Sequence, residues 1–397
     1  MASQRREAAI VGIYEYPLRA VERGMTPLHI KADCAQRALE DAGLSWRDVD
    51  GLYDAADGGG MPGLGLADYF GFKPAVIDTT AVGGSSYEFQ AAHAMRDIAA
   101  GKCRVALLSY GSTAHSNMTA IGTGGATGVG PPNASGNMQD PWGMTLIANY
   151  GLVKQRHKFQ YGTKEEQFAA ISVTTRTHAV RNPQAVKAME DLAFVGTGEI
   201  TVQDVLDSRM IADPLHLLEC CMVSDGGGAV VIAAADVARG TKKPPVWIIG
   251  AGEATRYLEN DRDITVSAAS QSGPAAFGEA GVRPDEIDIA MIYDSFTITV
   301  LTCLEDLGFC KKGEGGSFVE GEKLRFDTPG LALNTDGGGL SSNHPGMRGI
   351  FLLLEATRQL RGESTSQKDG ARLAVAHGNG GFLGSTHTGG TVILARD

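Results

Sequence analysis

Two stretches of the chain, 238 residues apart, follow the same order of residue types. The first reads ALEDAGLSWRDVDGLYDAAD and the second reads AFGEAGVRPDEIDIAMIYDSF, with Ala42-Gly43 aligned on Ala280-Gly281. Each stretch is typical of a helix that ends at a glycine and is followed by an acidic link and a buried strand. One such match also arises by chance, because alanine-glycine before an acidic turn is common. The shared order of elements nevertheless favours a duplicated α/β unit.

Other apolar runs fit two α/β halves. The runs AAIVGIY, VALLSYGS, AVVIAAAD, VWIIGAG and TVILARD are candidates for buried strands. Residues 119–144 contain too much Gly, Pro and Asn for regular structure, and a loop of that length is usually functional. The following KEEQFAAISVTTRTHAV has the period of a helix, which Asn182-Pro183 would end.

The expected organisation is therefore two halves around an insert. The first half comprises residues 1–118 and 221–245, the loop-rich insert residues 119–220, and the second half residues 246–397.

Composition excludes several functional classes. The chain is 43% apolar and 20% charged, as globular proteins are, and its net charge of −11 argues against nucleic-acid binding. It shows neither the apolar core of a signal peptide nor a membrane-length apolar run, so we expect a cytoplasmic protein. The six cysteines show no CxxC pair and no zinc-type spacing, which predicts buried free thiols and no metal.

The stretch DTTAVGGSSYEFQAA, residues 78–92, contains the first candidate site. Two glycines permit a tight strand-to-helix turn, and a helix start offers unpaired N–H groups and a positive dipole end. Many enzymes place a nucleophile at such a turn. Here Ser85 and Ser86 follow the glycines, and the stretch has no cysteine. Ser85 is therefore a candidate catalytic residue or simply a helix cap.

Three further stretches place polar residues or glycines beside apolar runs. They are YDSFT (293–297), GGGLSSNHPGMRG (337–349) and HGNGGFLG (377–384). None is specific alone. The chain has neither GxxxxGK[ST] nor a well-placed GxGxxG, which argues against a nucleotide-binding fold.

Together with DPLHLLECCMVSDGGGAVV (213–231), these stretches resemble the thiolase superfamily, and most closely its sterol-carrier-protein-x type. That family has a CxS turn before a long helix, then HDCF, GHP and a glycine-rich C-terminal loop. YGTKEEQ and LEDLGFCKKGEG extend the resemblance over nearly the whole chain. It implies a five-layered αβαβα thiolase fold built from two similar βαβαβαββ halves. It also implies a homodimer acting on coenzyme A thioesters, with coenzyme A as part of the substrate and no other cofactor.

The chain departs from this family at its sulfur-bearing positions. The nucleophilic cysteine falls on Ser85, although a shift of one residue would give Gly84. HDCF reads Tyr293-Asp294-Ser295-Phe296, and GHP survives as Asn343-His344-Pro345. A helix start and a histidine can turn a thiol into a thiolate, whereas a serine needs a dedicated base. Loss of both thiols therefore disfavours acyl transfer.

The same departures resemble the thiolase-like aldolases of bacterial steroid side-chain degradation, known as lipid-transfer proteins. These lack the nucleophilic cysteine and carry tyrosine in a YDxF motif, which YDSF matches. The resemblance implies retro-aldol cleavage of a β-hydroxyacyl-CoA with a steroid, terpenoid or aromatic tail. It also implies a small zinc-ribbon/OB-fold partner in a heterotetramer. One departure remains, because those aldolases use a second tyrosine where this chain has Asn343 and His344.

The resemblance assigns ten site residues. The catalytic candidates are Tyr293, His344, Ser85, Asp294 and Ser295, and the substrate-binding candidates are Gly84, Ser86, Asn343, Asn379 and Gly380. Tyr293 and His344 would move the proton, with the Ser85 turn at the thioester. Ordinary roles stay open: Asp294 as a loop cap, Ser295 as a filler for the lost cysteine, and Gly380 for turn geometry. A serine-variant thiolase or acyltransferase and a non-catalytic acyl-CoA-binding scaffold are the alternative functions.

Overall fold

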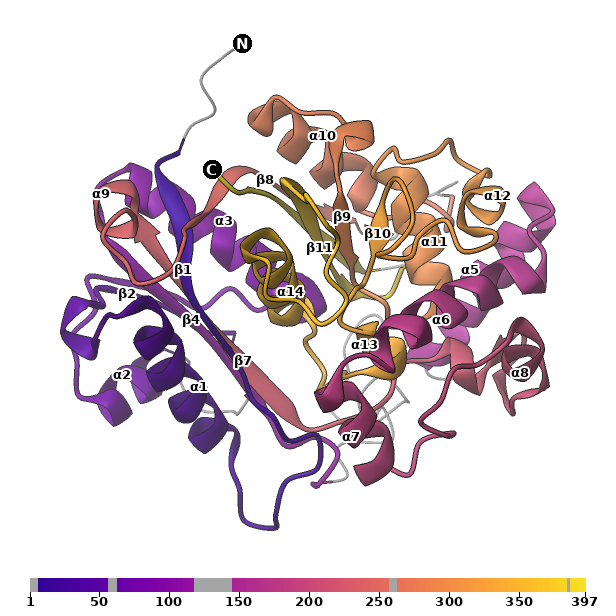
Figure 1. Ribbon diagram of the computed structural model, residues 1–397, viewed down its shortest axis with the longest axis horizontal. Helices are drawn as coiled ribbons and strands as arrows, with labels where there is room; N and C mark the ends of the chain where they lie inside the picture. The colour runs from indigo at the N-terminus through magenta and orange to yellow at the C-terminus, as the bar shows by residue number, and fades with distance from the viewer. Residues whose placement is uncertain (1–5, 56–62, 118–144, 257–262, 384–385) are drawn as a thin grey trace.

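The computed structural model describes residues 6–55, 63–117, 145–256, 263–383 and 386–397, and it contains two halves of the same βαβαβαββ order (Figure 1). The first half comprises β1 (Ala8–Glu15), α1 (Pro27–Ala42), β2 (Gly51–Tyr53), α2 (Leu64–Phe70), β3 (Val76–Asp78), α3 (Ser86–Ala99), β4 (Val105–Ser112) and β7 (Gly226–Ala234). The second comprises β8 (Val246–Arg256), α10 (Ala269–Ala280), β9 (Ile289–Ile292), α11 (Thr297–Asp306), β10 (Ala332–Leu333), α14 (Gly349–Arg361), β11 (Leu373–Gly381) and β12 (His387–Ala395). The short helices α9 (Ala235–Ala238), α12 (Gly315–Val319) and α13 (Gly338–Ser341) lie in connections. All five predicted strands are confirmed.

The strand order repeats the duplication. The ten strands run β10-β9-β11-β12-β8-β1-β7-β4-β2-β3, so the order in one half mirrors that in the other. Strands β2 and β9 each pair in parallel with both neighbours, whereas the remaining pairs are antiparallel. The halves join through a short antiparallel pairing of β1 with β8.

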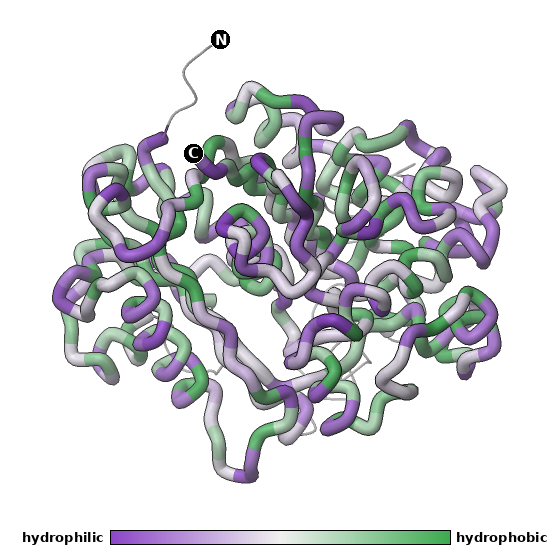
Figure 2. The backbone as a smooth tube through the Cα atoms, in the orientation of Figure 1, coloured by the Kyte–Doolittle hydropathy of each residue, from purple (hydrophilic) through white to green (hydrophobic). Residues whose placement is uncertain are grey.

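Helices cover both half-sheets on both sides. Helix α1 packs on β1, β4 and β7, and α10 packs on β8 and β12, while α3 and α14 contact strands of both half-sheets. Side chains alternate along the strands, so Ile10 faces the central core and Val11 the outer one. Figure 2 shows hydrophobic residues concentrated along the strands and mixed with hydrophilic ones on the outer helices. The expected helix–sheet–helix–sheet–helix arrangement is confirmed.

The repeat found in the sequence is visible at matching positions. Helix α1 ends at Gly43 (φ +74°) and α10 at Gly281 (φ +67°), each in the left-handed conformation that glycine tolerates. A 3₁₀ turn and a buried strand follow in both halves. A Cβ on Gly12 would lie 2.1 Å from the Ala38 carbonyl oxygen, so β1 needs glycine where α1 crosses it.

The part of the insert that the structure describes, residues 145–220, differs from the loop-rich segment expected from the sequence. It contains α5 (Leu146–Tyr161), α6 (Glu165–Ala179), α7 (Pro183–Asp191), α8 (Val202–Asp207) and a hairpin of β5 (Met210–Ala212) and β6 (Leu215–His216). Helix α6 is the predicted one, and Asn182 caps α7. Residues 145–220 are thus mainly helical rather than loop-rich, because capping side chains at Thr145, Asn182 and Thr201 start helices between the polar links. The loop expected at residues 119–144 lies outside the described residues. In the described chain, no helix has the length and hydropathy needed to cross a bilayer.

Candidate active site

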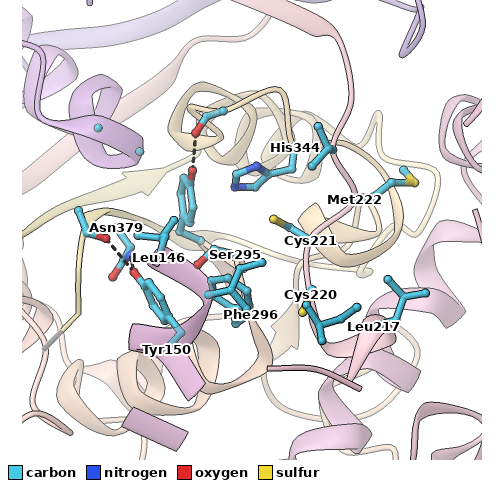
Figure 3. Close-up of a pocket in the computed structure, with 18 of the residues that line it drawn as sticks. Leu146, Tyr150, Leu217, Cys220, Cys221, Met222, Ser295, Phe296, His344 and Asn379 are labelled. Atoms are coloured by element: carbon cyan, nitrogen blue, oxygen red, sulfur yellow. Dashed lines mark hydrogen bonds between the residues drawn. The ribbon is translucent and has the colours of Figure 1, made fainter. Parts of the chain in front are cut away.

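A cavity of about 480 Å³ lies where the glycine turn before α3 meets the ends of β9 and β11 and the insert (Figure 3). Most of its wall is apolar, including Leu146, Ile147, Phe194, Ile211, Leu217 and Phe296. A few polar side chains interrupt this wall, and Arg209 is the one charged residue among the described lining residues. Such a cavity suits an apolar ligand that is oriented by a few polar groups.

Tyr293 directly follows β9 and enters the cavity as a phenol. Its hydroxyl donates a hydrogen bond to the Gly346 carbonyl (2.9 Å) and accepts one from the Arg348 N–H (3.3 Å). Its ring stands perpendicular to that of His344, with the ring centroids 5.4 Å apart. Burial raises the pKa of Tyr293 well above its ordinary value. Tyr293 is therefore placed as a hydrogen-bond donor and not as a phenolate.

His344 offers a neutral ring to the cavity. Its backbone N–H donates to Ser224 Oγ (3.0 Å), and an isolated bridge pairs it with Val223. Neither ring nitrogen has a hydrogen-bond partner in the described structure, although the residue is only 4% exposed. Burial, together with the positive charge of Arg348, lowers the pKa of His344 to about 3. The unprotonated ring can therefore accept a proton from a ligand.

Tyr150, Ser295 and Asn379 supply the other polar side chains of the cavity. Asn379 Nδ2 donates to the Tyr150 hydroxyl (2.8 Å), whereas Asn379 Oδ1 has no partner among the described groups. Tyr150 in turn donates to the Gly381 carbonyl (3.1 Å). Ser295 Oγ is hydrogen-bonded to Thr299 Oγ1 (3.0 Å). The structure thus brings four of the ten candidate side chains, Tyr293, Ser295, His344 and Asn379, into one cavity.

At the glycine turn, Gly84 faces the cavity and Ser85 does not. Ser85 Oγ is hydrogen-bonded to Thr388 Oγ1 (2.7 Å) and to the Val82 carbonyl (3.3 Å), and its side chain is fully buried. Ser86 Oγ donates to the Gly83 carbonyl (2.6 Å) and likewise lies outside the lining. Of the residues at this turn, Gly84 therefore lines the cavity, whereas the side chains of Ser85 and Ser86, which were expected at the thioester, lie outside the lining.

Asp294 and Asn343 hold the His344 loop instead of lining the cavity. Asp294 accepts hydrogen bonds from the Gly339 N–H (2.7 Å) and from Arg348 Nε (3.1 Å). Asn343 accepts one from Arg348 Nη1 (2.7 Å). All three are buried away from the lining, so the two candidates act through packing and position rather than on a ligand.

Gly380 also lies outside the lining of the cavity, and the packing of the backbone explains why this position is a glycine. A Cβ at this position would lie 2.0 Å from the Val82 carbonyl oxygen and 2.4 Å from Thr388 Oγ1. The missing side chain lets β11 approach the segment that leads into α3.

Sequence reasoning missed Tyr150 and Cys221. The backbone N–H of Cys221 donates to the Ser295 carbonyl (2.9 Å), and the residue lines the cavity. No local pattern signals this, because the contact depends on isolated bridges between distant segments, Cys220 with Phe296 and Val223 with His344. In the described residues, no group of three or more His, Cys, Asp or Glu side chains is arranged to hold a metal ion.

Comparison with known proteins agrees with this geometry. The family model of the thiolase C-terminal domain-like proteins matches residues 250–396. An acetyl-CoA acetyltransferase of Methanothermobacter thermautotrophicus is 34% identical over 376 residues, which cover 90% of each chain. The chain belongs to the thiolase superfamily.

Two other similarities place the chain beside the lipid-transfer aldolases. A steroid side-chain-cleaving aldolase of Thermomonospora curvata is 30% identical over 94% of this chain and 95% of its own. The solved structure of the Ltp2-ChsH2(DUF35) aldolase has a TM-score of 0.85 at 27% identity, and the match covers 100% of this chain and 99% of that one. The resemblance to thiolase-like lipid-transfer proteins is confirmed.

Proposed function

We propose that this thiolase-superfamily enzyme cleaves the Cα–Cβ bond of a β-hydroxyacyl-CoA by a retro-aldol reaction, releasing a ketone or aldehyde and a shorter acyl-CoA. One observation carries the proposal. The Tyr293 ring occupies the space that a side chain at position 84 would need, and the unpartnered His344 ring faces the same cavity. This cavity offers a base and hydrogen-bond donors but no nucleophile at the turn. Retro-aldol cleavage requires only a base and hydrogen-bond donors.

His344 is the base in this proposal. One of its free ring nitrogens takes the proton of the β-hydroxyl, and the Cα–Cβ electron pair moves into the thioester to form an enolate. The low pKa of His344 rises as negative charge develops beside the ring, because a nearby anion favours the imidazolium. Backbone N–H groups at the start of α3 and the Tyr293 hydroxyl stabilise the enolate oxygen.

The apolar wall of the cavity favours a substrate with a bulky apolar acyl tail. Leu146, Phe194, Leu217 and Phe296 offer no charge to a substrate, and about 480 Å³ is in the range of cavities that enclose small organic ligands. One relative is named as a steroid side-chain-cleaving aldolase. We therefore propose a steroid side-chain-like or similarly bulky acyl-CoA, with coenzyme A as part of the substrate.

A small protein partner is part of the same proposal. The similar solved aldolase contains a DUF35 protein beside the Ltp2 chain. We propose that a homodimer of this chain binds a zinc-ribbon/OB-fold partner of that kind to form a heterotetramer.

Acyl transfer is the second candidate function. It is favoured by the 34% identity to an acetyl-CoA acetyltransferase and by the thiol of Cys221 in the cavity wall. In that case an acyl group would be found on Cys221, and turnover would consume free coenzyme A.

The test is incubation of the chain, with and without its partner, with β-hydroxyacyl-CoA thioesters and no added coenzyme A. Retro-aldol cleavage predicts release of a ketone or aldehyde and of a short acyl-CoA in equal amounts. Turnover only after addition of coenzyme A, with an acyl adduct in the intact mass, would establish acyl transfer. Binding of thioesters without any turnover would leave the chain as a scaffold and refute the proposal.

A further inference from the structure

Retro-aldol cleavage leaves an enolate, and the α-carbon of that enolate must receive a proton before the short acyl-CoA can leave. The Tyr293 hydroxyl donates to the Gly346 carbonyl in the structure, and in the proposed reaction its hydrogen bond goes to the enolate oxygen, so its proton is already used. Ser295 carries an alcohol, which is a very weak acid. Another donor is needed in the described wall of the cavity.

We propose that Cys221 is a further catalytic residue, whose thiol protonates the α-carbon of the enolate. The inference rests on the proposed retro-aldol function. The inference extends that function, because it assigns the second proton transfer to a residue from the first half of the molecule, across the cavity from β9.

The backbone fixes Cys221 beside both other candidates. Its N–H donates to the Ser295 carbonyl (2.9 Å), and Val223, two residues further on, bridges His344. Figure 3 shows the Cys221 sulfur turned toward the cavity, between the His344 ring and Ser295. No hydrogen bond from this sulfur is found within the described chain, whereas the neighbouring Cys220 sulfur donates to the His216 carbonyl (3.3 Å). Of the two adjacent thiols, Cys221 is the one available to a ligand.

The surroundings of Cys221 keep its proton in place. Burial, followed by the charges of Cys220 and Asp294, raises the pKa of the thiol above its ordinary value. A thiol that stays protonated is a poor nucleophile, because the thiolate is the attacking species. It remains a donor to a strongly basic carbanion. The site therefore suits an acid better than an acyl carrier.

All proton transfers of the proposed reaction take place between the substrate, His344 and Cys221. The β-hydroxyl proton moves to His344 as the Cα–Cβ bond breaks and the ketone or aldehyde forms. The enolate α-carbon then forms a C–H bond with the Cys221 proton, which leaves a thiolate beside the His344 imidazolium. Return of the proton from the imidazolium to the thiolate restores two neutral groups. No oxidant, reductant or further reactant is required.

Exchange of the α-proton of the short acyl-CoA product gives a direct test of this step. The chain with its partner is incubated in D₂O with propionyl-CoA, and deuterium uptake at the α-carbon is followed by mass spectrometry. We expect Cys221→Ala and Cys221→Ser to slow exchange at least about 100-fold, since general acid–base groups contribute about that much or more. Cys310→Ala is the matched control, because it removes a half-buried thiol outside the cavity and should leave exchange unchanged.

Each outcome decides one question. Normal exchange and cleavage in a folded Cys221→Ser variant would overturn the role of Cys221 while the proposed function stands. A wild-type protein that neither exchanges the α-proton nor cleaves any β-hydroxyacyl-CoA would instead refute the proposed function itself. An acyl group trapped on Cys221 would show a nucleophile and overturn the inference. Cys221→Ser is nearly isosteric, so it keeps the test valid if Cys221→Ala unfolds, as thermal unfolding would show.

Discussion

The ring of Tyr293 lies directly against the backbone of Gly84. A Cβ on residue 84 would be 2.4 Å from Tyr293 Cε2 and Cζ, and equally close to the Asn379 carbonyl oxygen. Position 84 therefore cannot carry a side chain while the phenol stays where it is. A nucleophilic side chain at this position and the observed placement of Tyr293 exclude one another.

Gly84→Ala should consequently damage the site more than the fold. The added methyl group displaces the Tyr293 ring or the β11 backbone, and overpacking of this kind costs about 1–3 kcal/mol of unfolding free energy. We expect loss of most cleavage activity, measured as ketone release, together with a lower urea midpoint. Gly278→Ala is the control, because it lies inside α10 with nothing within 4 Å of its Cβ, and it should stabilise by about 0.5–1 kcal/mol. Full activity in Gly84→Ala would contradict the packing argument.

Tyr293→Phe tests the hydroxyl apart from the ring. The ring still fills the space above Gly84, but the hydrogen bonds with Gly346 and Arg348 are lost. We expect kcat for cleavage to fall about 10²- to 10⁴-fold, with a stability loss of about 1 kcal/mol. Tyr53→Phe removes a comparable hydroxyl, which donates to Asp97 (3.0 Å) outside the cavity, and should leave kcat unchanged. Equal kinetics for the two variants would exclude the Tyr293 hydroxyl from the reaction.

The fold was predictable because its signals are local. Glycine ends α1 and α10 at Gly43 and Gly281, and the apolar runs of the strands are continuous in the sequence. These features depend on residues within one turn or one strand, so the duplicated order could be recognised before any contact was known.

The site was only partly predictable, because facing directions are not local. Adjacent residues on a helical turn point in directions about 100° apart, so counting from a helix end could not decide between Ser85 and Gly84. Asp294 and Asn343 lie next to true lining residues but turn toward Arg348. Cys221 enters the cavity only through contacts between segments far apart in the sequence.

The buried neutral His344 makes stability depend on pH in the acid range. Its pKa is about 3 in the folded chain and 6.5 when exposed, so the unfolded state binds the proton first as pH falls. The stabilisation is complete above pH 6.5 and is lost as pH falls toward 3, on the order of 5 kcal/mol over that range. His344→Asn should flatten the decline of the urea-derived free energy between pH 6.5 and 4. The same slope in both proteins would show that the ring is protonated in the folded state.

His93 should behave in the opposite way. It bridges Asp78 (2.5 Å) and Glu253 (3.0 Å), and these hydrogen bonds raise the pKa of His93 to about 9. The folded state binds the proton more tightly, so the stabilisation is present below pH 6.5 and is lost as pH rises through 9. Because the side chain is partly exposed, the effect should be about 1–2 kcal/mol after screening. His93→Gln should therefore destabilise at pH 6 and become nearly neutral at pH 10, as measured by chemical denaturation at both values.

Arg348 stabilises the fold and also holds the His344 loop in position, so its removal should lower both the unfolding free energy and the cleavage rate. Its buried guanidinium contacts Asp294 (3.1 Å) and Asp336 (2.6 Å), and it holds Asn343 next to His344. Arg348→Met leaves two carboxylates buried without their partner, which costs about 3–5 kcal/mol. The pKa of Asp294, which burial already raises to about 6 against the pull of Arg348, would rise further.

The measurements are a urea titration at pH 7 and the rate of thioester cleavage. Arg348→Met should lower the unfolding free energy by the stated amount, and cleavage should fall even where the protein is folded, because the His344 loop loses its anchor. Arg348→Lys keeps the charge but not the forked geometry, so it should recover part of the stability and little of the activity. Arg283→Met, at an exposed pair with Asp285, should change the free energy by less than about 1 kcal/mol. If Arg348→Met cleaved at the wild-type rate, the ion-pair cluster would support the fold alone, and the His344 loop would keep its position without it.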